Sequence, residues 1–287
     1  MDFWFSENHS KNVKYSVKVD RHLFSKTSEF QRIDIFRSEE LGNILVLDGY
    51  IMVTEKDEFV YHEMITHPAF AVNPDIKNIL VIGAGDGGTI RELVKYESVS
   101  NIDMVEIDKE VVDACVVYLP QTAGKLNDPR VNIYYEDGLR FVRTKKNLYD
   151  LIVVDSTDPF GTGEGLFTRE FYGNCFNALT DNGILLNQHE SPFFENDAKA
   201  ATRISRLMRK VFPIASVYQA HIPTYPSGHW LFGFASKKLH PISDMDEKKA
   251  GLWNNLALKL KYYNTELHKG AFALPNYVKE LLEDDDI

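Results

Sequence analysis

The chain has 287 residues, 44% of them hydrophobic and 26% charged, which suits a globular protein with one large domain or one large and one small domain. Its formal net charge is −10 and its lysines and arginines form no dense run, which argues against nucleic-acid binding. No apolar run approaches the roughly 20 residues of a membrane span, and residues 1–11 lack the apolar stretch of a signal peptide, so we expect a cytoplasmic protein.

The first fifty or so residues are predicted to form β-structure. Residues 13–19 alternate apolar and polar side chains, and so do residues 32–35. The apolar stretch 45–53 is interrupted by Asp48-Gly49, a strong signal for a hairpin. We therefore expect a small N-terminal β domain over residues 1–53. A helix over residues 57–67 is predicted to follow it and to stop at Pro68.

From residue 78 onward, short apolar strands alternate with helices. The predicted strands cover residues 79–82, 102–105, 131–134, 151–154 and 183–186, followed by 214–218 and 230–234, which are expected to pair antiparallel. Helices are predicted from about residue 109, over residues 168–179 and over residues 197–211. This order predicts a doubly wound, mainly parallel α/β sheet in a catalytic domain over residues 54–287, with a C-terminal helical tail from about residue 240.

The two cysteines, Cys115 and Cys175, fall in predicted helices, and we expect both to be buried small hydrophobes. The chain has no CxxC motif and no His–Cys spacing of the kind that binds zinc. These patterns argue against a disulfide framework and predict no metal site.

Acidic residues follow the predicted parallel strands. They are Asp86, Glu106, Asp137, Asp155 and Glu190. Because the carboxyl ends of parallel strands share one edge of the sheet, we expect these acids to converge on one crevice. Helix capping is the alternative explanation. We expect it for Asp108, and it explains Asp137-Gly138 about as well as ligand binding does.

The loop after the first parallel strand fits the pattern GxGxxG through Gly83, Gly85 and Gly88. Glycines allow close approach to either a dinucleotide or an adenosyl sulfonium, and Glu106 stands where an acid binds ribose hydroxyls in both cases. Asp86 helps to separate the two, because a carboxylate in this loop would repel a pyrophosphate but not a positively charged ligand. The loop therefore favours a sulfonium nucleoside.

The stretch after the fourth parallel strand reads Asp155-Ser156-Thr157-Asp158-Pro159 and continues through Gly161, Gly163 and Gly165. It puts two carboxylates at the predicted crevice, on a loop able to close over a substrate. A plain surface connection would not require acids at this anchored end.

Several separated motifs together resemble the spermidine synthase family over nearly the whole chain. They are residues 47–49, 57–63, 83–92, 105–108, 137–138, 155–159, 225–228, 262–264 and 273–275. The resemblance implies a fold of the S-adenosylmethionine-dependent methyltransferase type behind a small N-terminal β domain. It also implies transfer of an aminopropyl group from decarboxylated S-adenosylmethionine to putrescine, giving spermidine and 5′-methylthioadenosine. The donor is a co-substrate, no bound cofactor is expected, and the family forms homodimers or homotetramers.

The same resemblance assigns roles by position. The donor nucleoside would be bound by Gln31, Gly83, Gly85, Asp86, Glu106, Asp137, Gly138 and Thr162, and the amine by His62, Asp86, Asp155, Asp158 and Tyr225. Asp155 would be the general base, and Tyr61 would orient the reacting amine. At residue 162 the family commonly has proline, so Thr162 departs from its pattern.

Two of the expected positions rest on further reasoning from the residues. Gln31 shares a predicted strand face with Ile33 and Ile35, and for that position taken alone, hydrogen bonding to the backbone explains a polar side chain better than a ligand does. For the remote ammonium of the diamine we expect a carboxylate, with Glu190 as the candidate.

Other functions fit parts of the pattern. An S-adenosylmethionine-dependent methyltransferase acting on a diamine would keep the nucleoside site. A dinucleotide-dependent oxidoreductase would share the glycine loop, although Asp86 argues against it, and a non-enzymatic binding relative would not need Asp155, Tyr61 and Asp158. Among acceptors, putrescine is favoured because His62 suits a short dication, while cadaverine, agmatine and longer polyamines stay open.

Overall fold

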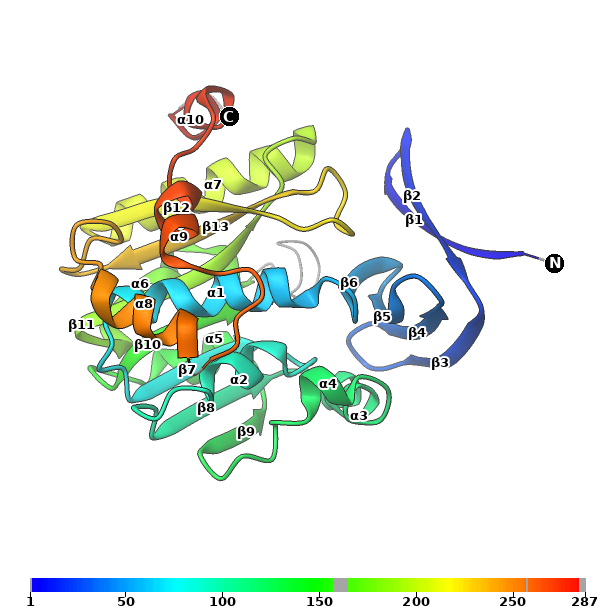
Figure 1. The fold of residues 1–287 in the computed structure, drawn as a ribbon, viewed down its shortest axis with the longest axis horizontal. Coiled ribbons are helices and arrows are strands. Elements are labelled where there is room, and N and C mark those ends of the chain that lie inside the picture. The colour runs from blue at the N-terminus through cyan, green and yellow to red at the C-terminus, as the bar shows by residue number, and fades with distance from the viewer. Residues whose placement is uncertain (1, 157–164, 257, 284–287) are drawn as a thin grey trace.

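The computed structural model describes residues 2–156, 165–256 and 258–283. Its strands are β1 (Phe3–Ser10), β2 (Val13–Val19), β3 (Arg21–Thr27), β4 (Arg32–Ser38), β5 (Gly42–Leu47), β6 (Tyr50–Thr54), β7 (Asn78–Gly83), β8 (Asn101–Glu106), β9 (Val131–Tyr135), β10 (Tyr149–Asp155), β11 (Leu179–Glu190), β12 (Ile214–His221) and β13 (His229–Ser236). Its helices are α1 (Glu58–Val72), α2 (Gly88–Leu93), α3 (Lys109–Tyr118), α4 (Pro120–Ala123), α5 (Gly138–Arg143), α6 (Arg169–Ala178), α7 (Glu195–Val211), α8 (Glu247–Leu256), α9 (Thr265–Ala271) and α10 (Asn276–Glu283). Figure 1 shows their arrangement.

The large sheet has seven strands in the order β12-β13-β11-β10-β7-β8-β9. The five strands from β11 to β9 are parallel, while β13 and β12 run antiparallel at one edge. Each predicted strand of this region lies inside an observed strand, so the predicted doubly wound fold is confirmed. The chain order reverses between β7 and β10, which is where such sheets form a ligand crevice.

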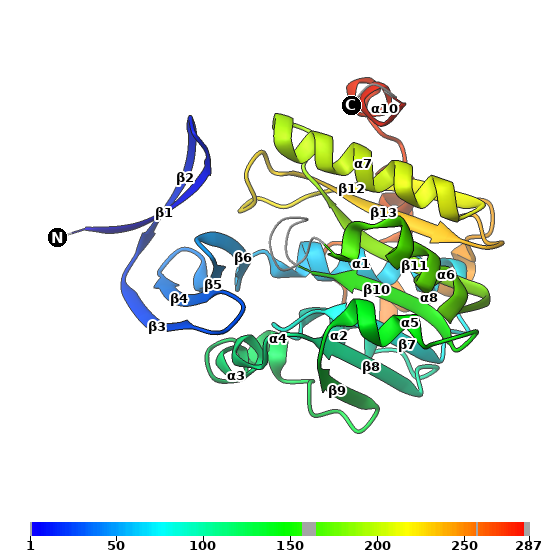
Figure 2. The ribbon, with the colours of Figure 1, turned by 180° about the vertical axis from the view of Figure 1, so that it is seen from behind.

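Helices cover both faces of the large sheet. Helices α1, α8 and α9 lie in front of it in Figure 1, whereas α5, α6 and α7 lie in front in the reverse view of Figure 2. Successive residues of β7 point to opposite faces, so that Ile79 and Val81 join one hydrophobic cluster and Leu80 and Ile82 join the other. Burial on both faces explains why these strands are apolar throughout.

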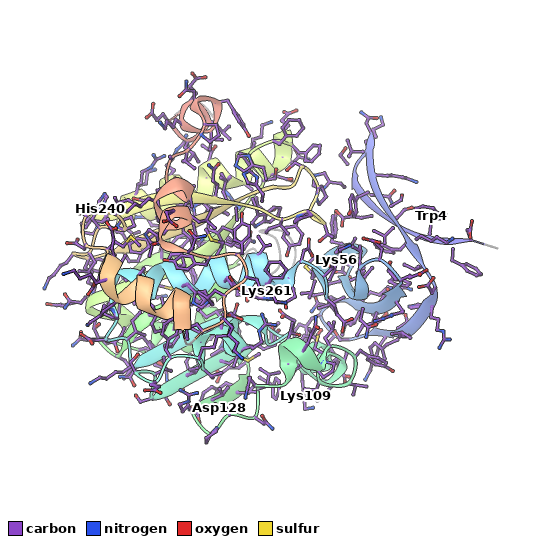
Figure 3. The ribbon with its side chains drawn as sticks, viewed as in Figure 1. Trp4, Lys56, Lys109, Asp128, His240 and Lys261 are labelled. Atoms are coloured by element: carbon purple, nitrogen blue, oxygen red, sulfur yellow. The ribbon has the colours of Figure 1, made fainter. Side chains whose placement is uncertain are left out.

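The predicted N-terminal β-structure is confirmed. Strands β1 and β2 form an antiparallel hairpin, and β3 to β6 form a four-stranded antiparallel sheet. The turn between β5 and β6 falls at Asp48-Gly49, both with positive φ, as the sequence predicts. Trp4 lies on β1 at the outer end of the molecule, away from the large sheet (Figure 3). The side chains of Phe3 and Trp4 are exposed there.

The predicted end of the first helix at Pro68 is wrong, because α1 continues to Val72 with Pro68 inside it. A proline in a helix leaves the carbonyl four residues earlier without its N–H partner. That carbonyl belongs to Met64, and it accepts a hydrogen bond from the buried Tyr218 hydroxyl at 2.8 Å. A residue of β12 therefore replaces the missing bond and allows the helix to continue.

The C-terminal tail packs on α1. The buried Glu63 carboxylate accepts the backbone N–H groups of Lys261, Tyr262 and Tyr263 at 2.8–2.9 Å. The tail then forms α9 and α10. Among the described residues, no helix is both long enough and apolar enough to cross a bilayer.

The two cysteines lie where the sequence predicts them. Cys115 is in α3 and Cys175 in α6, and both are free and buried. Burial raises the pKa of each thiol well above its usual value, so both behave as small apolar side chains.

Candidate active site

A cavity of about 140 Å³ lies at the carboxyl ends of β7, β8 and β10. The predicted site residues that line it are Gln31, Tyr61, His62, Gly83, Gly85, Asp86, Glu106, Asp137, Gly138, Asp155 and Tyr225. Asp158 and Thr162 lie outside the described residues, and Glu190 lies in the wall of an adjoining cavity. The structure thus brings together side chains from the N-terminal sheet, from α1 and from four strand ends.

Gly83 allows the ends of β7 and β10 to meet. The two strands pair in register up to Gly83 and Asp155. A Cβ at position 83 would lie 2.0 Å from the Asp155 carbonyl oxygen, and φ at this residue is +88°, so a side chain is excluded on both grounds. The next residue, Ala84, donates its N–H to the same carbonyl at 2.8 Å. The glycine therefore holds Asp155 beside the glycine loop.

The Asp155 carboxylate is held by two hydroxyl groups. Tyr61 on α1 donates to Oδ1 at 2.7 Å, and Thr89 on α2 donates to Oδ2 at 2.6 Å. Burial, together with the negative charge of nearby Asp86, raises the pKa of Asp155 above its usual value. Burial and the Asp155 charge likewise raise the pKa of Tyr61, so the tyrosine stays protonated.

Asp86, in the glycine loop, has a cationic partner. Its Oδ1 accepts the Gly88 N–H at 2.8 Å and lies 3.2 Å from His62 Nε2. Burial alone would raise the pKa of Asp86, but the His62 charge more than compensates and holds it below its usual value. Asp86 is therefore an ionised carboxylate, beside an Asp155 whose pKa is shifted in the opposite direction.

Glu106 ends β8 and is almost fully buried. Its Oε1 accepts the Asp108 N–H at 2.9 Å, and burial raises its pKa to about 7. Asp108 caps α3, as predicted, by accepting the Glu110 N–H. Gln31 lies one residue before β4, and its Nε2 donates to Asp108 Oδ2 at 3.0 Å, so its partner is a side chain and not the backbone.

Both explanations of Asp137 keep support. Asp137 caps α5 by accepting the Leu139 N–H at 2.8 Å, as the capping alternative predicts. The same residue and Gly138 line the cavity. A Cβ on Gly138 would lie 2.4 Å from Ile82 Cγ2, so only glycine lets the start of α5 pack this closely on β7.

A second cavity, of about 300 Å³, adjoins the first. Both cavities are lined by Met52, Tyr61, Ser156 and Tyr225, so they meet beside these four residues. The acids that line the second cavity are Glu7, Glu190 and Asp197. Tyr225, between the cavities, is fixed by donating its hydroxyl to the Met52 carbonyl at 2.8 Å.

Comparison with protein families identifies the chain. Residues 58–247 match the model described as "Spermine/spermidine synthase domain". The chain belongs to the spermidine synthase family. Residues 3–55 match the model described as "Spermidine synthase tetramerisation domain", which implies that this family member forms a homo-oligomer.

Curated relatives of the family match along the full length. The polyamine aminopropyltransferase of Alkaliphilus oremlandii is 66% identical over 286 residues and that of Clostridium perfringens is 64% identical over 286 residues, with 100% of each chain covered. A crystal structure of spermidine synthase in complex with the transition-state analogue AdoDATO has a TM-score of 0.94 and 44% identity, covering 98% of this chain and 94% of that one. Spermidine synthase from Thermotoga maritima gives 0.92 and 43%, with the same coverage. The large sheet is thus of the methyltransferase type that the family resemblance implies.

Several side chains at the two cavities were not predicted from the sequence. Thr89, which binds Asp155, stands in a quoted family motif, but nothing in the sequence marks its partner. Glu7 and His9 come from β1, in a segment predicted only as β-structure, yet Glu7 is buried and accepts the Ile51 N–H at 2.9 Å. His9 lies between Glu7, at 3.6 Å, and Asp197 on α7, at 3.1 Å.

The ligand atoms of His62, Asp86 and Asp155 lie within 4.8 Å of one another, which is the spacing of a metal site. His62, however, contacts carboxylates through both ring nitrogens, and its pKa is raised to about 10, chiefly by Asp86 and Glu58 against the effect of burial. A protonated imidazole does not bind a metal ion. The absence of a metal site stays a prediction.

Proposed function

We propose that this polyamine aminopropyltransferase takes its aminopropyl group from decarboxylated S-adenosylmethionine and transfers it to putrescine. The observation that carries the proposal is the pair of buried acids with opposite pKa shifts, Asp86 and Asp155, at the edge of the sheet where ligands bind. One acid is paired with a cation and stays charged. The other is held by neutral hydroxyls and is suited to accept a proton.

The donor fits the first cavity. Glu106 at the end of β8 would accept hydrogen bonds from the two ribose hydroxyls. Gln31 lines the same cavity and is held there by its hydrogen bond to Asp108. Asp137 and Gly138 would meet the adenine. Asp86 would bind the ammonium of the aminopropyl group. Its Oδ1 is engaged by His62 and Gly88, and no hydrogen bond from the described residues occupies Oδ2.

The chemistry follows from the charge of the acceptor. A diamine with pKa values near roughly 10 is doubly protonated at neutral pH, and a protonated nitrogen cannot attack carbon. Asp155 takes one proton, and its raised pKa makes it a stronger base than an exposed aspartate. The freed nitrogen attacks the methylene next to the sulfonium, the carbon–sulfur bond breaks, and 5′-methylthioadenosine leaves as a neutral thioether. Tyr61, bonded to Asp155, is placed to orient the nitrogen lone pair.

The acceptor fits the second cavity. The reacting nitrogen would lie where the two cavities meet, between Tyr61, Tyr225 and Asp155. The wall of the second cavity carries three acids, which suit the remote ammonium of the diamine: Glu7, Glu190 and Asp197. Putrescine is the proposed acceptor because a single further ammonium matches the Glu190 position expected from the sequence.

The assembly and location of the chain are part of the proposal. We propose a homotetramer built through an N-terminal β domain of residues 1–53, which bears the exposed Phe3 and Trp4, with residues 54–287 as the catalytic domain. A cytoplasmic location agrees with two buried free thiols.

The variant Asp155→Asn tests the central role. The amide keeps the shape of the carboxylate but cannot accept the proton, so we expect kcat to fall by about 10²- to 10⁴-fold. Chromatography of 5′-methylthioadenosine release measures the rate, and calorimetry measures the affinity for 5′-methylthioadenosine, which should change little. Asp181→Asn, an exposed surface aspartate far from the cavity, is the matched control.

The same assay separates the alternatives. Offering decarboxylated S-adenosylmethionine and S-adenosylmethionine in turn with putrescine, and identifying the product by mass, should give spermidine from the first donor and no methylated amine from the second. Near-normal turnover of Asp155→Asn would exclude the base role, and methylation would replace the proposed reaction with that of a diamine methyltransferase.

A further inference from the structure

A chain of charged side chains, half-buried at its first member and buried after it, leads from α2 to the cavity. Arg91 on α2 makes two hydrogen bonds of 2.8 Å to the Glu58 carboxylate on α1. Glu58 in turn lies 2.6 Å from His62 Nδ1, and His62 Nε2 lies 3.2 Å from Asp86 Oδ1. The series Arg91, Glu58, His62 and Asp86 alternates in charge, and its last three members line the cavity. We name it the α1–α2 charge chain.

Both nitrogens of His62 are used inside this chain. The imidazole is only 2% exposed, and each nitrogen contacts a carboxylate, so no ring N–H remains to bind a substrate amine. The ring also packs closely against the glycine loop, because a Cβ on Gly88 would lie 2.2 Å from its Cε1 atom. His62 is therefore held in position by the two carboxylates and by the glycine loop.

The surroundings of His62 keep it positively charged. Glu58 on its own helix, Asp86 in the glycine loop and Asp155 at the end of β10 are the negative groups facing it, while Tyr61 packs edge-on. Burial alone would raise the pKa of Glu58, but its contacts with His62, and next those with Arg91 behind it, lower that pKa to about 2 and keep the carboxylate ionised. Two acids flanking one imidazole hold it as an imidazolium.

We propose that His62 is a positioning cation and not an amine ligand, and that Glu58 and Arg91 act through it to orient Asp86 toward the donor ammonium. The inference rests on the proposed function, since it names what sets the orientation of the donor-binding acid. With Oδ1 of Asp86 held by His62 and the Gly88 N–H, Oδ2 is the atom left to face the ammonium. Removing Glu58 frees the imidazole to lose its proton and weakens the contact that orients Asp86.

If the contacts among Arg91, Glu58 and His62 served folding alone, a different result would be expected. Breaking them would lower stability and would leave the relative affinities for two ligands of the same cavity unchanged. The α1–α2 charge chain instead predicts a selective effect, because decarboxylated S-adenosylmethionine carries the ammonium that Asp86 binds and 5′-methylthioadenosine does not.

The kinetic test compares Glu58→Gln with Glu63→Gln in the full chain. Both are buried acids on α1, but Glu63 binds the C-terminal tail and lines neither cavity. We expect Glu58→Gln to raise KM for decarboxylated S-adenosylmethionine about tenfold, the loss of one charged hydrogen bond, and to change the affinity for 5′-methylthioadenosine less than about twofold. Glu63→Gln should lower the unfolding midpoint and leave the ratio of the two affinities unchanged. Arg91→Lys should raise KM for decarboxylated S-adenosylmethionine by less than Glu58→Gln does and by more than Glu63→Gln does.

The direct test measures His62 itself in the wild-type chain. Its ¹⁵N ring resonances, assigned by their loss in His62→Gln, should show an imidazolium at pH 8, where a free histidine is neutral. Glu58→Gln should shift the titration toward lower pH. A neutral His62 at pH 8, or equal losses for both ligands in Glu58→Gln, would overturn the inference, and the resonance decides alone if that variant does not fold. If wild-type chain neither binds 5′-methylthioadenosine nor forms spermidine, the proposed function fails instead.

Discussion

A single methyl group at Gly88 should disrupt the packing between α1 and α2. In Gly88→Ala the added Cβ would lie 2.2 Å from His62 Cε1 and 2.4 Å from each ring nitrogen, distances that real Cβ atoms do not reach. The ring cannot yield without leaving Glu58 or Asp86. Breaking a buried ion pair costs about 3–5 kcal/mol, and overpacking alone costs about 1–3 kcal/mol, so we expect a loss of about 3–5 kcal/mol in the free energy of unfolding.

Denaturant unfolding followed by circular dichroism measures this loss, and Gly173→Ala is the matched control. Gly173 lies inside α6 with nothing within 4 Å of a built Cβ, so its replacement should stabilise the chain by about 0.5–1 kcal/mol. A double-mutant cycle identifies the partner, because in a His62→Ala background Gly88→Ala should cost less than about 1 kcal/mol. An equal cost in both backgrounds would refute the reasoning that the imidazole is what fills this space.

Two further predictions concern the ligands. Burial raises the pKa of Glu106 to about 7, with Asp108 and Asp155 as the neighbouring acids, whereas accepting two ribose hydroxyls favours the ionised form. Binding of 5′-methylthioadenosine should therefore release a proton and weaken up to about tenfold per pH unit as the pH falls below about 7, a slope that calorimetry should find missing in Glu106→Gln. Glu190→Gln should raise KM for putrescine by about tenfold and leave donor affinity unchanged, and steady-state kinetics with unchanged putrescine KM would remove Glu190 from the acceptor site.

The acids of the crevice could be predicted because the strands that precede them are identified by their own apolar residues. Glu106 and Asp155 end their strands and Asp86 lies three residues after the end of β7, and parallel strands must present these ends at one edge of the sheet. The step from apolar runs to parallel strands and one shared edge requires no contact between residues far apart in the chain. The doubly wound fold and the position of the cavity could therefore be predicted from the sequence.

What could not be predicted depends on partners far along the chain. Pro68 is a helix terminator by local rules, and only the Tyr218 hydroxyl, 154 residues away from Met64, removes its cost. The spacing of Glu58 and His62, one helical turn apart, is a visible signal for a pair on α1. Nothing local, however, shows that Asp86 and Arg91 complete the series.

Strand β1 has two ends with different surroundings. Phe3 and Trp4 are exposed at its outer end, and Glu7, on the same strand, is buried in the wall of the second cavity. Since a strand rises about 3.3 Å per residue, only about 10 Å separates Trp4 from Glu7. The segment that matches a tetramerisation domain therefore also lines the second cavity, so in the proposed assembly a shift of β1 against a neighbouring subunit would move part of the cavity wall.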